Sequence, residues 1–168
     1  MVGHTFLFNE AVREVKRRID GGELGNLHYL YSRRLNLGIV RSDVNAAWNL
    51  APHDISIACY LLDATPVSVN ATGVRALQPE APHLEDVVFA TIRFDSGVLM
   101  HTHVSWLDPR KVRTMTVVGD RKMIVYDDVG PDKLFLYDKG ITKGEVVAEE
   151  QPDSFARHRM ITRAGDLV

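Results

Sequence analysis

The sequence predicts an α+β fold in which an open, mainly antiparallel β-sheet carries helices on one face. Two helical patterns occur in the first third of the chain, and a run of short apolar strands follows them. Two short segments, residues 95–97 (Asp-Ser-Gly) and 119–122 (Gly-Asp-Arg-Lys), each separate two strands and predict hairpins. Hairpins make a sheet antiparallel. Helices segregated from such a run of strands cover one face of the sheet.

The N-terminal part of the chain predicts a strand, a helix and a second strand. Residues 2–8 are apolar and predict a strand, and Asn9 is suited to cap a helix because its side-chain oxygen can accept a backbone N–H. Apolar residues then recur at helical spacing as far as Ile19, and Gly21-Gly22 ends the helix. Residues 27–37 are rich in Tyr and Leu and predict a long strand.

A second helix is predicted over residues 50–62, after a polar loop over 38–47. Pro52 fits only the first turn of this helix, where a missing N–H costs little. The strands that follow are predicted at residues 67–77, 86–94, 98–106, 112–118, 123–126, 134–137 and 145–148. We expect these side chains to be buried: Phe6, Phe8, Cys59, Phe94 and Trp106.

Composition excludes several classes of protein. The chain is 45% hydrophobic and 25% charged, which is typical of one globular domain over residues 1–168. A net charge of -2 argues against a nucleic-acid partner, and no apolar run approaches a membrane span. The N-terminus has no signal-peptide pattern, so a cytoplasmic protein is expected. Neither a G-x-G-x-x-G nor a P-loop pattern occurs.

Residues 48–54 contain the best candidate for proton transfer. Asn49 and His53 stand four residues apart and share one face of a helix, and an imidazole titrates near neutral pH. The pattern alone leaves alternatives open, because His53 can also bond locally within a helix and Asn49 can serve as an N-cap, the role its position favours. Asp54 lies about 100° around the helix from His53 and is expected to face another polar group.

Polar residues at the end of the strand over 27–37 form a second candidate site. Arg34 and Asn36 share one face of this strand, and an Arg beside an Asn can bind a polyol or a phosphate. A solvated strand end explains the pattern equally well. Asn45, four residues before Asn49, is a further candidate for substrate binding.

A metal site is not predicted. His101 and His103 share one face of a strand, a spacing that can ligate a metal ion. No carboxylate or third histidine has a matching position, and the single cysteine does not complete a zinc pattern.

Several strings, taken in order, resemble the C-terminal domain of the glucose–fructose oxidoreductase / inositol dehydrogenase (Gfo/Idh/MocA) family. They are GHTF (3–6), RLNLG (34–38), WNLAPHD (48–54), SWLDP (105–109), KVR (111–113) and KMIVYDD (122–128). The likeness is nearest to the subgroup that acts on nucleotide-linked amino sugars, such as UDP-N-acetylglucosamine-type 3-dehydrogenases. The likeness spans residues 1 to about 130 and is loose afterwards.

The resemblance implies the substrate domain of an enzyme that uses NAD or NADP to oxidise a secondary alcohol of a sugar or UDP-sugar. In this family a Rossmann domain with a catalytic Lys binds the nicotinamide, and the C-terminal domain supplies an Asp-x-x-x-His pair. His53 matches the base of that pair, with Asn49 beside it, and Arg34, Asn36 and Asn45 would contact the sugar. The bare sheet face commonly forms the oligomer interface, which implies a homodimer or a higher homo-oligomer.

The sequence departs from the family pattern in two ways. The Rossmann half lies outside residues 1–168, so we expect a single-domain fragment, shortened at both ends, that binds no cofactor alone. Asn49 occupies the acidic position of the motif, and an amide neither accepts a proton nor balances an imidazolium. Loss of that charge should lower the pKa of His53. The alternative is a non-catalytic sugar-binding or dimerisation module without redox activity.

Overall fold

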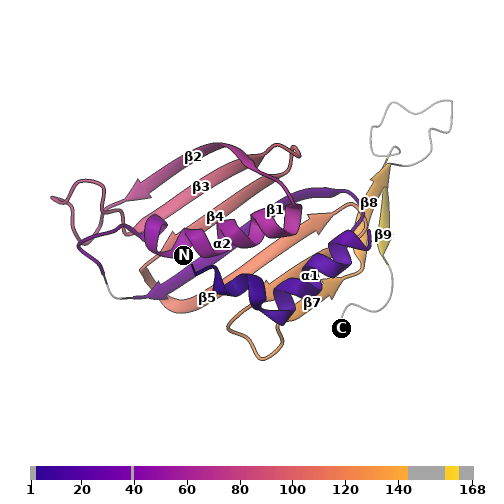
Figure 1. The fold of residues 1–168 in the computed structure, drawn as a ribbon, viewed down its shortest axis with the longest axis horizontal. Coiled ribbons are helices and arrows are strands. Elements are labelled where there is room, and N and C mark those ends of the chain that lie inside the picture. Colours follow the sequence, from indigo (N-terminus) through magenta and orange to yellow (C-terminus); the bar gives the residue numbers. More distant parts are fainter. Residues whose placement is uncertain (1–2, 39, 144–157, 163–168) are drawn as a thin grey trace.

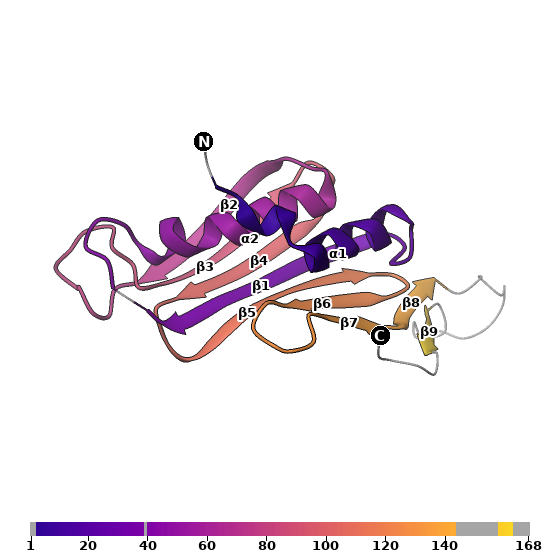
Figure 2. The same ribbon diagram turned by 60° about the horizontal axis from the view of Figure 1, so that its bottom comes forward.

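The computed structural model describes residues 3–38, 40–143 and 158–162. A seven-stranded sheet has the order β2-β3-β4-β1-β5-β6-β7, and both α-helices lie across one of its faces (Figures 1 and 2). All paired strands of this sheet are antiparallel except β1 and β4. The predicted α+β fold with an open, mainly antiparallel sheet is therefore confirmed.

The elements follow one another in a simple order, and a separate two-stranded sheet pairs β8 with β9. Their bounds are η1 Thr5–Phe8, α1 Glu10–Asp20, β1 Leu27–Leu37, α2 Ala46–Leu62, β2 Pro66–Val74, β3 Val87–Phe94, β4 Leu99–Ser105, β5 Leu107–Gly119, β6 Met123–Asp127, β7 Leu134–Tyr137, β8 Lys139–Lys143 and β9 His158–Thr162. Among the helices of the described ranges, none has the length and apolar character needed to cross a bilayer.

The N-terminal segment differs from its prediction. In the described part of residues 2–8, Thr5–Phe8 form one turn of 3-10 helix, so the predicted strand is wrong. Phe6 packs against the core, but Phe8 is 71% exposed beneath the Arg13 guanidinium, so the burial predicted for Phe8 is also wrong. A short apolar run has no readable period, so a strand and a packed turn have the same sequence pattern.

The first α-helix and the strand after it follow the sequence signals closely. The Asn9 side chain accepts the Ala11 N–H at 2.9 Å, which confirms the predicted cap of α1. The helix ends before Gly21, and Gly22 adopts a φ of +69°, a conformation that glycine adopts without strain. β1 occupies the predicted span.

Helix α2 begins four residues before its predicted start. Asn45 is its N-cap, because the Asn45 side chain accepts the Trp48 N–H at 2.9 Å. Asn49 lies within the helix, so its interpretation as an N-cap is wrong. Pro52 lies in the second turn rather than the first, and it cannot donate a hydrogen bond to the Trp48 carbonyl. Burial of the inner face of α2 against the sheet outweighs that loss.

The later strands confirm the predicted hairpins. β3 and β4 flank a turn in which Gly97 has a φ of +84°, and β5 and β6 form the second hairpin. The strand predicted over 67–77 ends at Val74, and the strand predicted over 112–118 extends in both directions as β5. The strand predicted over 145–148 lies outside the described residues.

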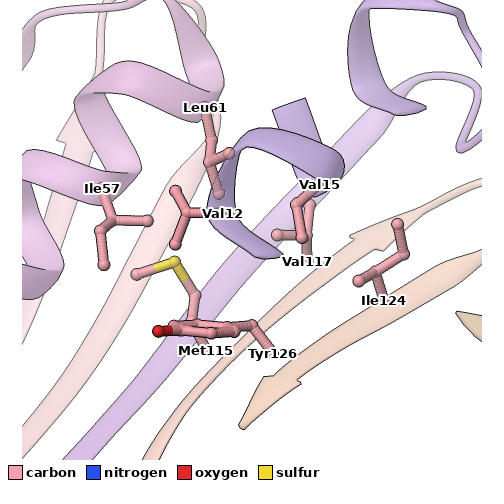
Figure 3. Close-up of a pocket in the computed structure, with 8 residues that line it drawn as sticks. All are labelled: Val12, Val15, Ile57, Leu61, Met115, Val117, Ile124 and Tyr126. Carbon is pink, nitrogen blue, oxygen red and sulfur yellow. The ribbon is translucent and has the colours of Figure 1, made fainter. Parts of the chain in front are cut away.

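The main core lies between the helices and the sheet. In Figure 3, side chains from α1, α2, β5 and β6 meet with no room for a water molecule between them. They are Val12, Val15, Ile57, Leu61, Met115, Val117, Ile124 and Tyr126. Phe94 and Trp106 are buried as predicted, and Cys59 is half-buried against the same core.

The opposite face of the sheet is open in the described structure (Figure 2). Tyr29 and Phe89 are 46% and 41% exposed on this open sheet face. Their aromatic rings stack on neighbours there, Tyr29 on Tyr31 and Phe89 on His103. The two faces therefore differ in kind: one is covered by helices, and the other presents aromatic and polar side chains.

Candidate functional site

His53 lies in α2 on the helix-covered side of the sheet, where it meets η1. Its ring is half-buried and makes an edge-on contact with Phe6, with ring centroids 5.1 Å apart. Among the residues that the structure describes, none hydrogen-bonds to the imidazole nitrogens of His53. The ring is therefore positioned by packing, and its nitrogens are available to a ligand.

A buried ion pair lies near this histidine, and both of its charges affect the pKa of His53. Arg34 of β1 donates from Nε and Nη2 to Oδ1 of Asp54, at 3.1 and 2.6 Å, and both side chains are almost fully buried. The expectation that Asp54 faces another polar group rather than His53 is thus confirmed. Oδ2 of Asp54 is buried and has no hydrogen-bond partner among the described residues.

Phe6 links the ion pair to the histidine. The Arg34 guanidinium carbon lies 4.7 Å from the centre of the Phe6 ring, and the same ring contacts His53. A cation above an aromatic face is attracted by the ring quadrupole. The 3-10 turn that replaces the predicted strand therefore has a clear role, because it carries Phe6 between Arg34 and His53.

The environment of His53 favours the neutral imidazole. Burial is the main cause that lowers the pKa of His53, and the positive charges of Arg34 and Arg113 lower it further. The carboxylate of Asp54 opposes this shift but does not reverse it. The sequence predicted a lowered pKa from the loss of a carboxylate at position 49, and the structure gives burial and two arginines as the causes.

Asp54 is the counter-charge of a guanidinium that stays charged at every relevant pH. Burial raises the pKa of the Asp54 carboxyl, and Arg34 opposes that rise. Removing either partner would leave the other charge or polar group buried and unpaired.

A second set of polar groups continues from this pair toward β6. The Tyr126 hydroxyl donates to Asp128 at 3.0 Å, and burial followed by the Asp128 charge raises the pKa of Tyr126. Arg113 of β5 also reaches Asp128, at 3.4 Å, and remains partly exposed. The charge of Arg113 therefore adds to that of Arg34 in lowering the pKa of His53.

The other predicted site residues lie nearby but have different surroundings. Asn49 is half-buried one turn before His53, and its amide has no hydrogen-bond partner within the described ranges. Asn36 lies two residues beyond Arg34 on the same face of β1 and is half-buried. Asn45 caps α2 and donates to Glu85 at 2.9 Å, so its polar atoms are already engaged. Arg34 is too deeply buried to be a surface contact.

A broad, open hollow of about 600 Å³ is lined by residues of α2 and of the N-terminal segment around η1, and His53 is not among its lining residues. Its lining is mainly apolar and includes His4, Pro52, Cys59 and Tyr60. Because the hollow is open and largely apolar, a second surface would be needed to enclose a polar ligand there.

In the described ranges, no group of three His, Cys, Asp or Glu side chains is placed to hold a metal ion. His101 and His103 lie on the open sheet face, where Thr91 hydrogen-bonds to His101 and Phe89 stacks on His103 at 4.2 Å. Burial is the main cause that lowers the pKa of His103.

The fold is an open sheet with two helices on one face, and α2 carries a histidine whose ring nitrogens have no hydrogen-bond partner among the described residues. A family model described as the GFO/IDH/MocA C-terminal domain matches residues 12–125. The chain belongs to this family. None of the curated proteins matches the sequence.

Solved structures agree with this assignment. A crystal structure of a putative oxidoreductase from Magnetospirillum magnetotacticum is 28% identical, with a TM-score of 0.69 over 80% of this chain and 43% of that one. UDP-N-acetylglucosamine 3-dehydrogenase GnnA from Acidithiobacillus ferrooxidans is 23% identical, with a TM-score of 0.62 over 76% and 42%. The WlbA dehydrogenase from Bordetella pertussis, in complex with NADH and UDP-GlcNAcA, is 18% identical, with a TM-score of 0.65 over 75% and 42%.

The chain therefore spans less than half the length of each of these three proteins. The two matches below 25% identity show a shared fold. The activity of a whole family member, with its cofactor and substrate, comes to this chain only as a proposal.

Proposed function

We propose that this chain is the substrate-binding domain of an NAD(P)-dependent sugar dehydrogenase, and that the sugar carries a nucleotide. The observation that supports it best is His53, a half-buried imidazole whose pKa is lowered by burial and whose ring nitrogens have no hydrogen-bond partner among the described residues. By resemblance, His53 matches the base of the family motif. The GnnA and WlbA structures, whose names refer to UDP-sugars, support the substrate class.

The reaction is the oxidation of a secondary alcohol to a ketone. His53 takes the hydroxyl proton on a ring nitrogen while the carbinol carbon loses a hydride, so a C–H and an O–H bond break and a C=O bond forms. The described residues form no dinucleotide-binding loop, and no residue of this chain is assigned to the cofactor that accepts the hydride. A neutral imidazole is the form that can accept the proton, and burial with Arg34 favours that form.

The asparagines and Arg34 have separate roles in this proposal. Asn49 offers a free amide one helical turn from His53, so it binds a substrate hydroxyl or orients the imidazole. Arg34 acts through Phe6 and through its charge on His53 rather than by touching the sugar. Asn36, half-buried near the end of β1, is a candidate sugar contact. Asn45 caps α2 and so fixes the start of the helix that carries His53.

The alternative function is a sugar-binding or dimerisation module without redox activity. Asn49 favours it, because an amide at the acidic position of the motif cannot balance the imidazolium that forms during proton transfer. The two functions differ in one measurable property, which is whether His53 changes the rate of a reaction or only the binding of a sugar.

Fusion of this chain to the cofactor-binding half of a family member tests the proposal. We expect NAD reduction with a UDP-amino sugar, and we expect His53→Ala to lower kcat about 100-fold or more. His28→Ala, in β1 away from the site, is the matched control and should leave the rate unchanged. Sugar binding without NAD reduction in the parent fusion would support the module instead.

Position 49 is tested in the same fusion. Asn49→Asp restores a carboxylate near the imidazolium, so it should increase kcat and raise the pH at which His53 titrates. If the Asn49→Asp fusion is no faster than the parent fusion, our view of the asparagine is wrong.

We also propose that the open sheet face joins two copies of this chain. Exposed aromatic side chains such as Tyr29 and Phe89 lie on a face that no described helix covers, and such surfaces are typical of association sites. Light scattering at micromolar concentration should give a dimer, and Phe89→Asp should dissociate it. A monodisperse parent monomer would contradict this interface.

A further inference from the structure

A second concentration of charge lies on the sheet face opposite to His53. Arg33 directly precedes Arg34 in β1, and because strand side chains alternate, it points to the open sheet face while Arg34 points to α2. Arg33 there lines a cavity of about 290 Å³. Arg110, Lys111, Thr114 and Asp127 line the same cavity.

The backbone of β5 brings two of these cations to the cavity. β1 pairs Leu35 with Val112 and Leu37 with Leu107, so β5 has three more residues than β1 between these two pairs. The extra residues form a bulge that contains Arg110 and Lys111, and bulges re-aim side chains out of the regular ladder. The bulge therefore places both cations beside the cavity that Arg33 lines.

The opposite wall of the cavity is a fixed loop between β6 and β7, which projects away from the helices in Figure 2. Oδ1 of Asp127 accepts the N–H groups of Val129 and Gly130 at 2.9 and 3.1 Å. Lys133 donates to the carbonyl oxygens of Asp128 and Gly130 at 2.9 and 2.8 Å, which closes the loop. Asp127 is thus the one carboxylate among the lining residues, and it is already used as an acceptor.

The three cations have no ion-pair partner within the part of the chain that the structure describes. Two other arginines of the same strands differ from them, because Arg34 pairs with Asp54 and Arg113 pairs with Asp128. Two guanidinium groups and one ammonium around one small cavity produce a local positive excess over the single lining carboxylate. Guanidinium forks match the oxygen spacing of phosphate, and the Thr114 hydroxyl adds a donor.

We infer that this cavity, between the bulge of β5 and the β6–β7 loop, binds a phosphate or diphosphate group. A volume of about 290 Å³ lies at the lower end of the range for small-molecule pockets, which suits such a small group rather than a whole nucleotide. The shared chemistry is the phosphate oxygen, whether it comes from free phosphate or from the end of a nucleotide. The site is independent of the proposed oxidation, because the sheet separates it from His53.

Calorimetry with the 168-residue chain and sodium pyrophosphate at low salt tests this inference. We expect one site, and we expect Arg110→Ala combined with Lys111→Ala to weaken binding by about tenfold or more, since each lost cation removes a charge-assisted hydrogen bond. The matched control is Arg13→Ala combined with Arg17→Ala on α1, which removes the same charge from the other face and should change binding less than about twofold.

Amide spectra locate the site independently of affinity. Pyrophosphate should shift the signals of residues 110–114 and 127–130, and UDP should shift the same residues if a nucleotide supplies the phosphate. Equal loss of binding in both double variants, shifts centred on His53, or equally tight binding of succinate would overturn the inference. The inference would also be overturned if Arg110→Ala combined with Lys111→Ala bound pyrophosphate normally but no longer dimerised. That result would mean that the cavity receives carboxylates of a second copy instead of phosphate.

Discussion

Replacing Arg34 with methionine is the sharpest test of how the site is held together. The change removes the guanidinium but keeps an unbranched side chain that can contact Phe6. It leaves the Asp54 carboxyl, 4% exposed, without the two donors that it now has at 3.1 and 2.6 Å. Removal of one partner of a buried ion pair typically costs about 3–5 kcal/mol, and we expect about 3 kcal/mol of unfolding free energy at pH 7.

The lower end of that range follows from the geometry. Both hydrogen bonds reach Oδ1, whereas Oδ2 of Asp54 is buried with no partner among the described residues, so its desolvation cost is already present in the parent. In Arg34→Met the pKa of Asp54 rises above its value in the parent, where Arg34 opposes the effect of burial. A raised folded-state pKa gives stability that is present below the unfolded carboxyl pKa and lost as pH rises through the folded value.

Urea unfolding followed by circular dichroism measures the effect. The loss in Arg34→Met should be smallest near about pH 4 and largest at about pH 7. Arg34→Met combined with Asp54→Leu should return to within about 1 kcal/mol of the parent, because an apolar pair replaces the ionic one. Arg41→Met breaks an exposed pair with Asp43 and should cause no measurable change. A loss of less than about 1 kcal/mol, or one that grows toward acid pH, would refute this reasoning.

The same geometry leads to three further expectations. Asn45→Ala removes the cap of α2 and should lower the unfolding free energy by about 1 kcal/mol or more. Asn49 lies inside the helix and is not hydrogen-bonded to any described residue, so Asn49→Ala should change this free energy by less than about 0.5 kcal/mol. Chemical denaturation distinguishes the two variants. The pKa of the His53 ring should lie below about 6.5 in an NMR titration. The stability linked to this group is therefore lost as pH falls from about 6.5 through the folded-state pKa. Arg34→Met should raise the pKa of His53, because it removes a nearby positive charge. Gly119→Ala would press a Cβ against the Leu24 carbonyl oxygen, so it should cost about 2 kcal/mol or more, and a melting temperature equal to the parent's would contradict the packing.

Much of the fold could be predicted because local signals and tertiary packing agree. Asn9, the Gly21-Gly22 pair and the hairpin turns each make a strong local choice, and the structure has α1, β1 and both hairpins where these signals place them. Agreement between local propensity and global fold is what makes such predictions succeed.

The wrong predictions concern positions where tertiary contacts decide between structures that the local sequence allows. Asn45 and Asn49 are both suited to cap a helix, and the contacts of Asn45 with His83 and Glu85, distant in sequence, favour Asn45. Pro52 in the second turn is unfavourable locally, and the burial of α2 against the sheet overrides it. Phe8 is apolar, but the turn that buries Phe6 points it to solvent.

The site could be predicted in part. Position 53 stands out from the sequence because a titratable side chain precedes an apolar helical run, and Asp54 was expected to face a polar partner. The identity of that partner, Arg34, required the sheet to lie under the helix, since the two residues are far apart in sequence and close in space. The cavity beside Arg110 and Lys111 could not be predicted from the sequence, because the bulge in β5 is visible only in the register of the strands.

We propose that the sugar binds beside His53 on the helix-covered side of the sheet. A crystal of the chain soaked with UDP-N-acetylglucosamine tests it most directly. We expect a ring hydroxyl oxygen within about 2.6–3.2 Å of an imidazole nitrogen of His53, with the Asn49 amide contacting the same sugar. A sugar ring bound on the open sheet face, with no contact to His53, would contradict it.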